Sequence, residues 1–228
     1  MPWGKANAAS PGFNLEDPMI HIVTPENEHL YRKQMAQVFR LRHKVFVEEM
    51  GWKALAKPDG REIDQFDTKH AVHMLYLEGG EVLGYQRLLP STRPHLLSEV
   101  MPQLCEVERP VGAHIWEISR HCVAPGHRAG GRYANHVANA LATALVEWGF
   151  ECGISQYIIE IDPVGVLPLI QLHFQLMPLG LPQNVNGKDV IALTMTFDNR
   201  TLQRLREMRG TRRRTLAETL HRPAQLHA

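Results

Sequence analysis

Long apolar runs are missing from this sequence. No run approaches the roughly 18 to 20 residues that a membrane-spanning helix needs, and the N-terminal residues lack the apolar core of a secretion signal. We therefore expect a cytoplasmic protein that is neither exported by that route nor embedded in a membrane.

Cysteine and net charge are also scarce. The three cysteines, Cys105, Cys122 and Cys152, are odd in number and form no C-x-x-C pair, which argues against a disulfide framework and against a zinc site. Lysine and arginine total 25 against 24 aspartates and glutamates, a net charge of +1. No global field therefore marks the protein as a polyanion binder.

The remaining composition is that of a folded domain. Apolar residues make up 44% of the 228 residues and charged residues 21%, so a packed core is expected. Residues 1–18 contain Gly, Pro, Ala and Asn without periodicity, and we predict a disordered extension there. Residues 19–228 are predicted to form one domain with a basic C-terminal helix or tail.

The pattern along the chain predicts alternating strands and helices. Thr24, Pro25 and Glu26 resemble a helix start after a first strand at 20–23. Apolar residues then recur at helical spacing as far as Phe46. Residues 51–68 lose this pattern and form a loop long enough to be functional.

Further strands are predicted around a clear central helix. Residues 70–78 and 81–89 flank Gly79-Gly80 as a hairpin, and the later strands and helices are expected at 115–123 (strand), 132–149 (helix), 154–161 (strand), 162–180 (helical), 190–197 (strand) and after the capping residue Asp198 (helix). This order predicts an α/β fold, a mixed sheet flanked by helices on both faces in an αβα sandwich. The arrangement resembles the fold of GCN5-related N-acetyltransferases.

One constellation of residues is more specific than its parts. In chain order it comprises Arg42, Phe46, Trp52, Asp64, Asp67, Arg87, Glu117 and Arg120. All eight positions are similar in type, order and local spacing to the signature of the LuxI-type acyl-homoserine-lactone synthases. The resemblance covers about residues 19–180 and implies an acyltransferase that acylates S-adenosylmethionine, releases methylthioadenosine and produces a quorum-sensing lactone.

Each of these residues also has a plainer interpretation. Phe46 and Trp52 are the kind of aromatics found in cores, Asp64 and Asp67 are typical turn formers, and Arg42 could pair at the surface with Glu48 or Glu49. Glu117 and Arg120 interrupt an apolar strand. Strand parity places them on opposite faces unless a bulge intervenes, and a buried charge needs a partner or a task.

The resemblance implies a role for each residue. S-adenosylmethionine carries a sulfonium, an ammonium and a carboxylate, so acids and a base should meet them: Asp64, Asp67 and Glu117 for the cations, Arg42 or Arg87 for the carboxylate. Rings of Phe46 and Trp52 would cover the sulfonium. Glu117 is our candidate to take the amine proton, and Arg120 or backbone N–H groups at a strand irregularity would stabilise the oxyanion. No cofactor and no metal is expected.

The acyl donor is predicted to be a coenzyme A thioester. Relatives that use acyl carrier protein tend to have basic residues after the central strand, whereas residues 164–180 contain no Lys or Arg. A loop with Arg128, Gly130, Gly131 and Arg132 resembles the pyrophosphate loop of acetyltransferases. The expected acyl pocket includes Met101, Trp148 and Met177. The segment 159–162 has no Thr where some relatives meet a 3-oxo group, so such a substrate is less favoured.

Two other functions remain open at this point. The fold and the Arg128 loop also suit an acetyl-CoA-dependent N-acetyltransferase, and the arginine-rich C-terminus suits a non-catalytic ligand-binding or DNA-associated regulator. We do not expect nucleic-acid binding, because the arginines also fit a solvated helix face. The sequence leaves the oligomeric state and the length of the acyl chain undetermined.

Overall fold

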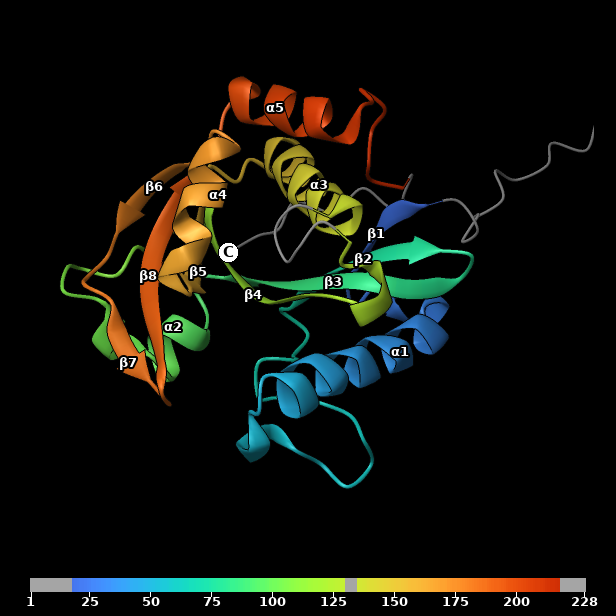
Figure 1. Cartoon of the computed structure of the whole chain (residues 1–228), viewed down its shortest axis with the longest axis horizontal. Coiled ribbons are helices and arrows are strands. Elements are labelled where there is room, and N and C mark those ends of the chain that lie inside the picture. The colour runs from blue at the N-terminus through green and yellow to red at the C-terminus, as the bar shows by residue number, and fades with distance from the viewer. Residues whose placement is uncertain (1–17, 130–134, 218–228) are drawn as a thin grey trace, which may run out of the picture.

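A computed structural model describes residues 18–129 and 135–217, which form one mixed sheet between two helical layers (Figure 1). The strand order is β1-β2-β3-β4-β5-β8-β6, with β7 also paired to β8, and only β4 and β5 run parallel. The strands are β1 Met19–Val23, β2 Val72–Glu78, β3 Glu81–Pro90, β4 Ile115–Val123, β5 Gln156–Ile161, β6 Gln175–Pro178, β7 Gln183–Val185 and β8 Lys188–Thr196. The predicted αβα architecture is confirmed.

The helices divide between the two faces of the sheet. Within the described ranges the α-helices are α1 Arg32–Arg42, α2 Leu96–Glu99, α3 His136–Cys152, α4 Val166–Gln171 and α5 Asn199–Arg209. Single turns of 3₁₀ helix lie at Glu28–Leu30, Lys53–Leu55, Pro102–Leu104, Pro125–His127 and Pro163–Gly165. Figure 1 shows α1 on one side of the sheet and α3 with α5 on the other. Of the described helices, none is long and apolar enough to cross a bilayer.

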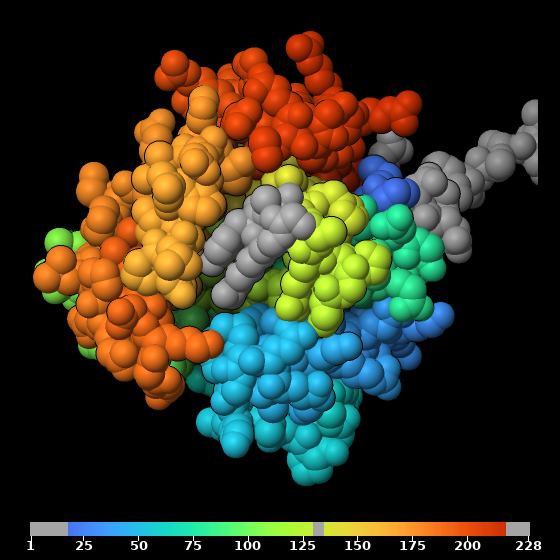
Figure 2. All heavy atoms as spheres, viewed as in Figure 1, coloured from blue at the N-terminus to red at the C-terminus, as the bar shows by residue number. Residues whose placement is uncertain are grey.

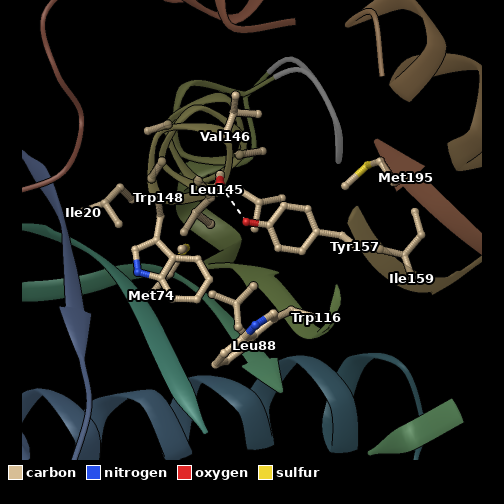
Figure 3. Packing of buried hydrophobic residues seen from close by; sticks show 14 of the residues in the cluster. Ile20, Met74, Leu88, Trp116, Leu145, Val146, Trp148, Tyr157, Ile159 and Met195 are labelled. Carbon is tan, nitrogen blue, oxygen red and sulfur yellow. Dashed lines mark hydrogen bonds between the residues drawn. The ribbon is translucent and has the colours of Figure 1, made fainter. Parts of the chain in front are cut away.

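The main core lies between the sheet and α3. Asn135 caps this helix by accepting the Ala138 N–H at 2.8 Å, and Gly153 ends it in the left-handed conformation at φ 70°. Trp116 and Trp148 meet edge to face below it, and the Tyr157 hydroxyl donates to the Leu145 carbonyl at 2.9 Å (Figure 3). The core therefore fixes β4 and β5 against one helix.

A β-bulge interrupts β4 in its middle. Tyr85 pairs with Cys122 but Arg87 pairs with Ser119, so β4 contains one residue more than β3 over this stretch. Arg120 has a φ of 55° in the left-handed region. The bulge puts the Arg120 side chain on the α1 side of the sheet, the side that Ser119 also faces.

The parallel pairing of β4 and β5 ends at the same level. Its last pair is Ile118 with Ile159, although β4 continues to Val123 and β5 to Ile161. From Ser119 onward, the residues of β4 have no paired residue on β5. The two central strands diverge at the bulge.

Three predicted elements differ from the structure. The helix predicted after Thr24 begins only at Arg32, because Asn27 bonds back to Thr24 and Ile22 and makes a turn. Beyond α1 the same segment continues as a π-helix, His43–Glu49. The helix predicted over 162–180 is only the six residues of α4, followed by the edge strand β6.

The arginine-rich end of the chain packs against the fold. Arg206 of α5 pairs with Glu147 of α3 at 3.1 Å, and Arg214 pairs with Glu151 at 2.9 Å. Next to Arg214, the Thr215 carbonyl accepts the N–H of Ile20 in β1 at 2.9 Å. At least part of this basic segment therefore has a structural role.

Candidate active site

A long loop brings three acids beneath the centre of the sheet. The Glu62 N–H donates to the Phe39 carbonyl of α1 at 3.0 Å, which ties the loop to the helix. Asp67 accepts the Asp64 N–H at 2.9 Å, and Asp64 accepts the Phe66 N–H at 2.9 Å. These turns bring the carboxylates of Glu62, Asp64 and Asp67 close together beneath the sheet.

Arg42, the last residue of α1, extends its side chain to these carboxylates. Its side chain is fully buried, and its Nε donates to Glu62. The two terminal nitrogens form a bidentate pair with Asp67 at 2.7 and 2.9 Å. The interpretation of Arg42 as half of a surface ion pair with Glu48 or Glu49 is therefore wrong.

Arg87 of β3 and Arg120 of the bulge complete the cluster. Arg87 holds Asp64 at 2.6 and 3.0 Å and Asp67 at 2.8 Å, while its Nε donates to the Ser119 hydroxyl at 3.1 Å. Arg120 donates to Asp64 at 2.6 Å and to Glu62 at 3.2 Å. Three arginines and three acids thus form one network, which we call the charge cluster: Arg42, Arg87, Arg120, Glu62, Asp64 and Asp67.

In this cluster, pairing with the arginines affects the pKa of the aspartates more than burial does. Burial by itself raises the pKa of a carboxyl group, yet the bonds from Arg42 and the charge of Arg87 hold the pKa of Asp67 well below its usual range. Arg87 and Arg120 likewise lower the pKa of Asp64 against the effect of burial. The formal charges sum to zero, which a buried site requires.

Two aromatic side chains cover the open side of Arg120. The rings of Phe46 and Trp52 stack with centroids 5.1 Å apart at 22°. The Arg120 guanidinium carbon lies 5.5 Å from the centroid of each ring. Trp52 remains half-buried. The pair therefore already forms a site for a cation, occupied here by a guanidinium.

Glu117 lies on the same side of the sheet but outside the charge cluster. It is fully buried and accepts the backbone N–H groups of Leu96 and Leu97, at 2.9 and 2.8 Å, at the start of α2. Its Oε1 is also 2.7 Å from His95 Nδ1. Arg109 lies 2.7 Å from the other ring nitrogen. Because arginine only donates, the His95 proton is on Nδ1 and points at Glu117.

A second glutamate lies beside Glu117. Burial, followed by the charge of Glu117 and a side-chain hydrogen bond with it, raises the pKa of Glu160 well above its usual range. Glu160 therefore holds a proton more readily than an ordinary glutamate does. Sequence reasoning did not single out Glu160, Glu62, His95 or Arg109 as site residues.

Other predicted residues are dispersed. Arg128 donates to the Val123 carbonyl at 2.8 Å and to Glu49 at 2.7 Å, while Gly130, Gly131 and Arg132 lie outside the described residues. Met101 packs under β5, Trp148 lies in the core on the opposite face, and Met177 is 66% exposed on β6. The structure does not bring these three together as one pocket, because they lie on different faces and at an edge.

One face of the molecule has a furrow. Figure 2 shows it between the orange residues around α4 and β8 and the blue residues at the end of α1, with green residues at its floor. Among residues 18–129 and 135–217, no three His, Cys, Asp or Glu side chains gather as metal ligands.

The fold recurs in a solved protein of low sequence identity. A putative N-acetyltransferase from Lactobacillus plantarum aligns with a TM-score of 0.50 at 20% identity, covering 78% of this chain and 99% of that one. At this identity the match shows the shared fold alone. The predicted likeness to the GCN5-related fold is thereby confirmed.

More similar proteins identify the family. Residues 26–205 match the model of the autoinducer synthases. The isovaleryl-homoserine lactone synthase of Bradyrhizobium diazoefficiens is 37% identical over 193 residues, 84% of this chain and 86% of that protein. The solved CoA-dependent acyl-homoserine lactone synthase BjaI has a TM-score of 0.84 at 35% identity, covering 90% and 95%. This chain belongs to the autoinducer synthase family, and the predicted acyltransferase class is confirmed.

Proposed function

We propose that this protein transfers an acyl group from an acyl-CoA to the amine of S-adenosylmethionine and closes the product to an acyl-homoserine lactone. The similar synthase BjaI was solved with S-adenosylmethionine and isopentyl-CoA. The observation that carries the proposal is the charge cluster beneath the bulged strand, with the Phe46–Trp52 pair on its open side.

The charge cluster suits a ligand with charges of both signs. S-adenosylmethionine brings a sulfonium, an ammonium and a carboxylate. The stacked rings of Phe46 and Trp52 already hold one cation, so they suit the sulfonium. Asp64 and Asp67 are acceptors for the ammonium, and Arg42 or Arg87 is a donor for the carboxylate. Each ligand charge can replace one partner of an existing pair.

The divergence of β4 and β5 suits the thioester. Residues of β4 beyond Ile118 have no paired residue on β5, so in our proposal a backbone N–H at the bulge donates to the thioester carbonyl. The same bond strengthens when that oxygen becomes an oxyanion. The amine attacks the carbonyl carbon, the C–S bond breaks, and the thiol leaves.

Amide formation also requires the amine to lose a proton. With an α-amino pKa near 8, making the amine neutral at pH 7 costs only about 1.4 kcal/mol, so a nearby carboxylate is sufficient. Glu117 is that carboxylate in our proposal. The ligand's carboxylate then attacks the carbon next to the sulfonium and expels methylthioadenosine.

The donor proposal depends on the surface after β5. The exposed side chains of α4 and the preceding turn are the apolar Val164, Leu167 and Ile170 and the uncharged Gln171, and no Lys or Arg lies in 164–180. An acidic carrier protein would find no Lys or Arg of this segment to pair with. Coenzyme A is therefore the favoured donor, and we place the reaction in the cytoplasm, where both substrates are made.

A product assay tests the proposal. Purified protein is mixed with S-adenosylmethionine and a panel of acyl-CoAs, or with acyl carrier protein thioesters, and free thiol, methylthioadenosine and lactone are measured. We expect all three products with a branched or aromatic acyl-CoA. Thiol release only with a different amine would instead indicate an N-acetyltransferase, and no turnover with any donor would indicate a binding protein.

A further inference from the structure

The proposed base, Glu117, is sealed from solvent. Its exposed fraction is 0%, and its oxygens already accept three donors from the start of α2. A proton from a substrate therefore has to reach Glu117 through a neighbouring group. Two described neighbours can be considered, His95 and Glu160.

The route through His95 is blocked. Its Nδ1 proton already points at Glu117, and Arg109 donates to its other nitrogen at 2.7 Å. A guanidinium has no acceptor and does not give up its proton in proteins. No proton can enter His95 from that side, so its role is to orient Glu117.

Glu160 is placed differently. Glu117 pairs with Ile158 across the parallel strands, and Glu160 lies two residues further along β5 on the same face. It is the first residue after the last pair, Ile118 with Ile159, where the two strands diverge. The residue is only half-buried. Glu160 thus lies next to both Glu117 and the gap where β4 and β5 diverge, which is where we place the thioester.

The carboxyl group of Glu160 has an unused atom. Its Oε1 is buried and has no hydrogen-bond partner of normal geometry among the described residues. The charged and titratable groups around it are Glu117 on β4, with His95 and Arg109 behind it, and Cys105 after the Pro102–Leu104 turn. Apart from Arg109, no cation in this set can neutralise a second carboxylate. Two adjacent glutamates with one negative charge between them share a proton.

We propose that Glu160 is a second catalytic carboxyl group, which relays the amine proton to Glu117. The amine N–H bond breaks as an O–H bond forms on one Glu160 oxygen, and the proton already on Glu160 moves to Glu117. Glu160 stays neutral and Glu117 becomes neutral. After the neutral amine has attacked, the pair returns one proton to the leaving thiolate. The second proton, which the nitrogen loses as the amide forms, passes to solvent, so atoms and charges balance. The inference rests on the proposed function.

Glu160→Gln tests the relay. Glutamine can still donate a hydrogen bond to Glu117, but it cannot accept one proton and release another. We expect the rate of thiol release in a single turnover to fall at least about tenfold, with the affinity for S-adenosylmethionine unchanged within twofold. Glu160→Asp, which keeps a titrating group, should retain an intermediate rate. Glu99→Gln, an exposed acid on α2, should match the wild type within twofold.

A double variant provides the sharper comparison. If both glutamates act in series, Glu117→Gln with Glu160→Gln should be no slower than the slower single variant. Multiplied losses, or a Glu160→Gln rate within twofold of wild type, would overturn the relay. Lactone production by the wild-type protein reports separately on the proposed function. Thermal unfolding and S-adenosylmethionine binding establish that each variant is folded.

Discussion

At the scale of single residues, Trp52 is the group most open to a direct test. It is half-buried and stacks on Phe46 over a guanidinium. Trp52→Ala should weaken S-adenosylmethionine binding by about two- to thirtyfold, the range of a cation–π contact of roughly 0.5–2 kcal/mol. Isothermal titration calorimetry with the ligand alone measures this. The maximal rate at saturating ligand should change less.

Phe150→Ala is the matched control for Trp52→Ala. Phe150 is an aromatic residue of α3 that is 47% exposed, and its ring meets Phe197 edge to face. Its removal should leave the ligand affinity unchanged. Equal affinity losses in both variants would mean that Trp52 acts through the general fold, and no loss in Trp52→Ala would remove its binding role.

The sequence predicted most residues of the site but not the equal number of arginines and acids in the charge cluster. Seven of the eight motif residues meet around the charge cluster, as their resemblance to a known signature implied, while Glu117 lies beside it. Glu62 escaped notice because a lone loop acid looks solvated. The number of charges pointed to a third acid. Three buried arginines need three acids, and Asp64 and Asp67 supply only two. Glu160 escaped because its meaning depends on the register of β4 against β5.

At the scale of elements, the contact between α3 and β3 depends on one glycine. A Cβ added at Gly84 would lie 2.3 Å from Val137 Cγ1 and 3.1 Å from Leu141 Cδ1. Gly84→Ala should therefore lower the free energy of unfolding by about 1–3 kcal/mol, the cost of overpacking a core. Urea unfolding measures it. Gly126→Ala, where nothing lies within 4 Å, should remain within about 0.5 kcal/mol.

Element boundaries were predictable where the pattern was periodic. The limits of β4 match the predicted strand at both ends, because Gly112 shortly before it and Pro125-Gly126 after it are loop signals. The apolar stretch 164–180 has no clear period, so it could not be divided between α4 and β6. The π-helix at His43–Glu49 and the bulge at Arg120 are set by tertiary contacts and could not be placed from local sequence.

At the scale of the whole molecule, two buried histidines should make stability depend on pH. Burial lowers the pKa of His21 and of His73 to about 4, whereas in an unfolded chain the value is about 6.5. Between these values the unfolded chain binds more protons, so stability falls as the pH falls from 6.5 to 4. Each group contributes up to about 1.4 kcal/mol per pH unit.

Urea midpoints at intervals between pH 8 and pH 4 measure this dependence. We expect a plateau above pH 7 and a steady decline below pH 6.5. His73→Gln should flatten the decline, because glutamine does not titrate, whereas His29→Gln, at an exposed position, should leave the slope unchanged. A wild-type midpoint that is constant down to pH 4.5 would contradict the assignment of neutral buried histidines.

The charge cluster also limits which substitutions this protein can accept during evolution. Any single replacement that removes a charge from Arg42, Arg87, Arg120, Glu62, Asp64 or Asp67 leaves an opposite charge buried without its partner, at a cost of about 3–5 kcal/mol. That loss is comparable to the whole stability margin of many domains. We therefore expect changes at these positions to occur as compensating pairs, and changes in acyl-chain preference to occur at positions outside the cluster.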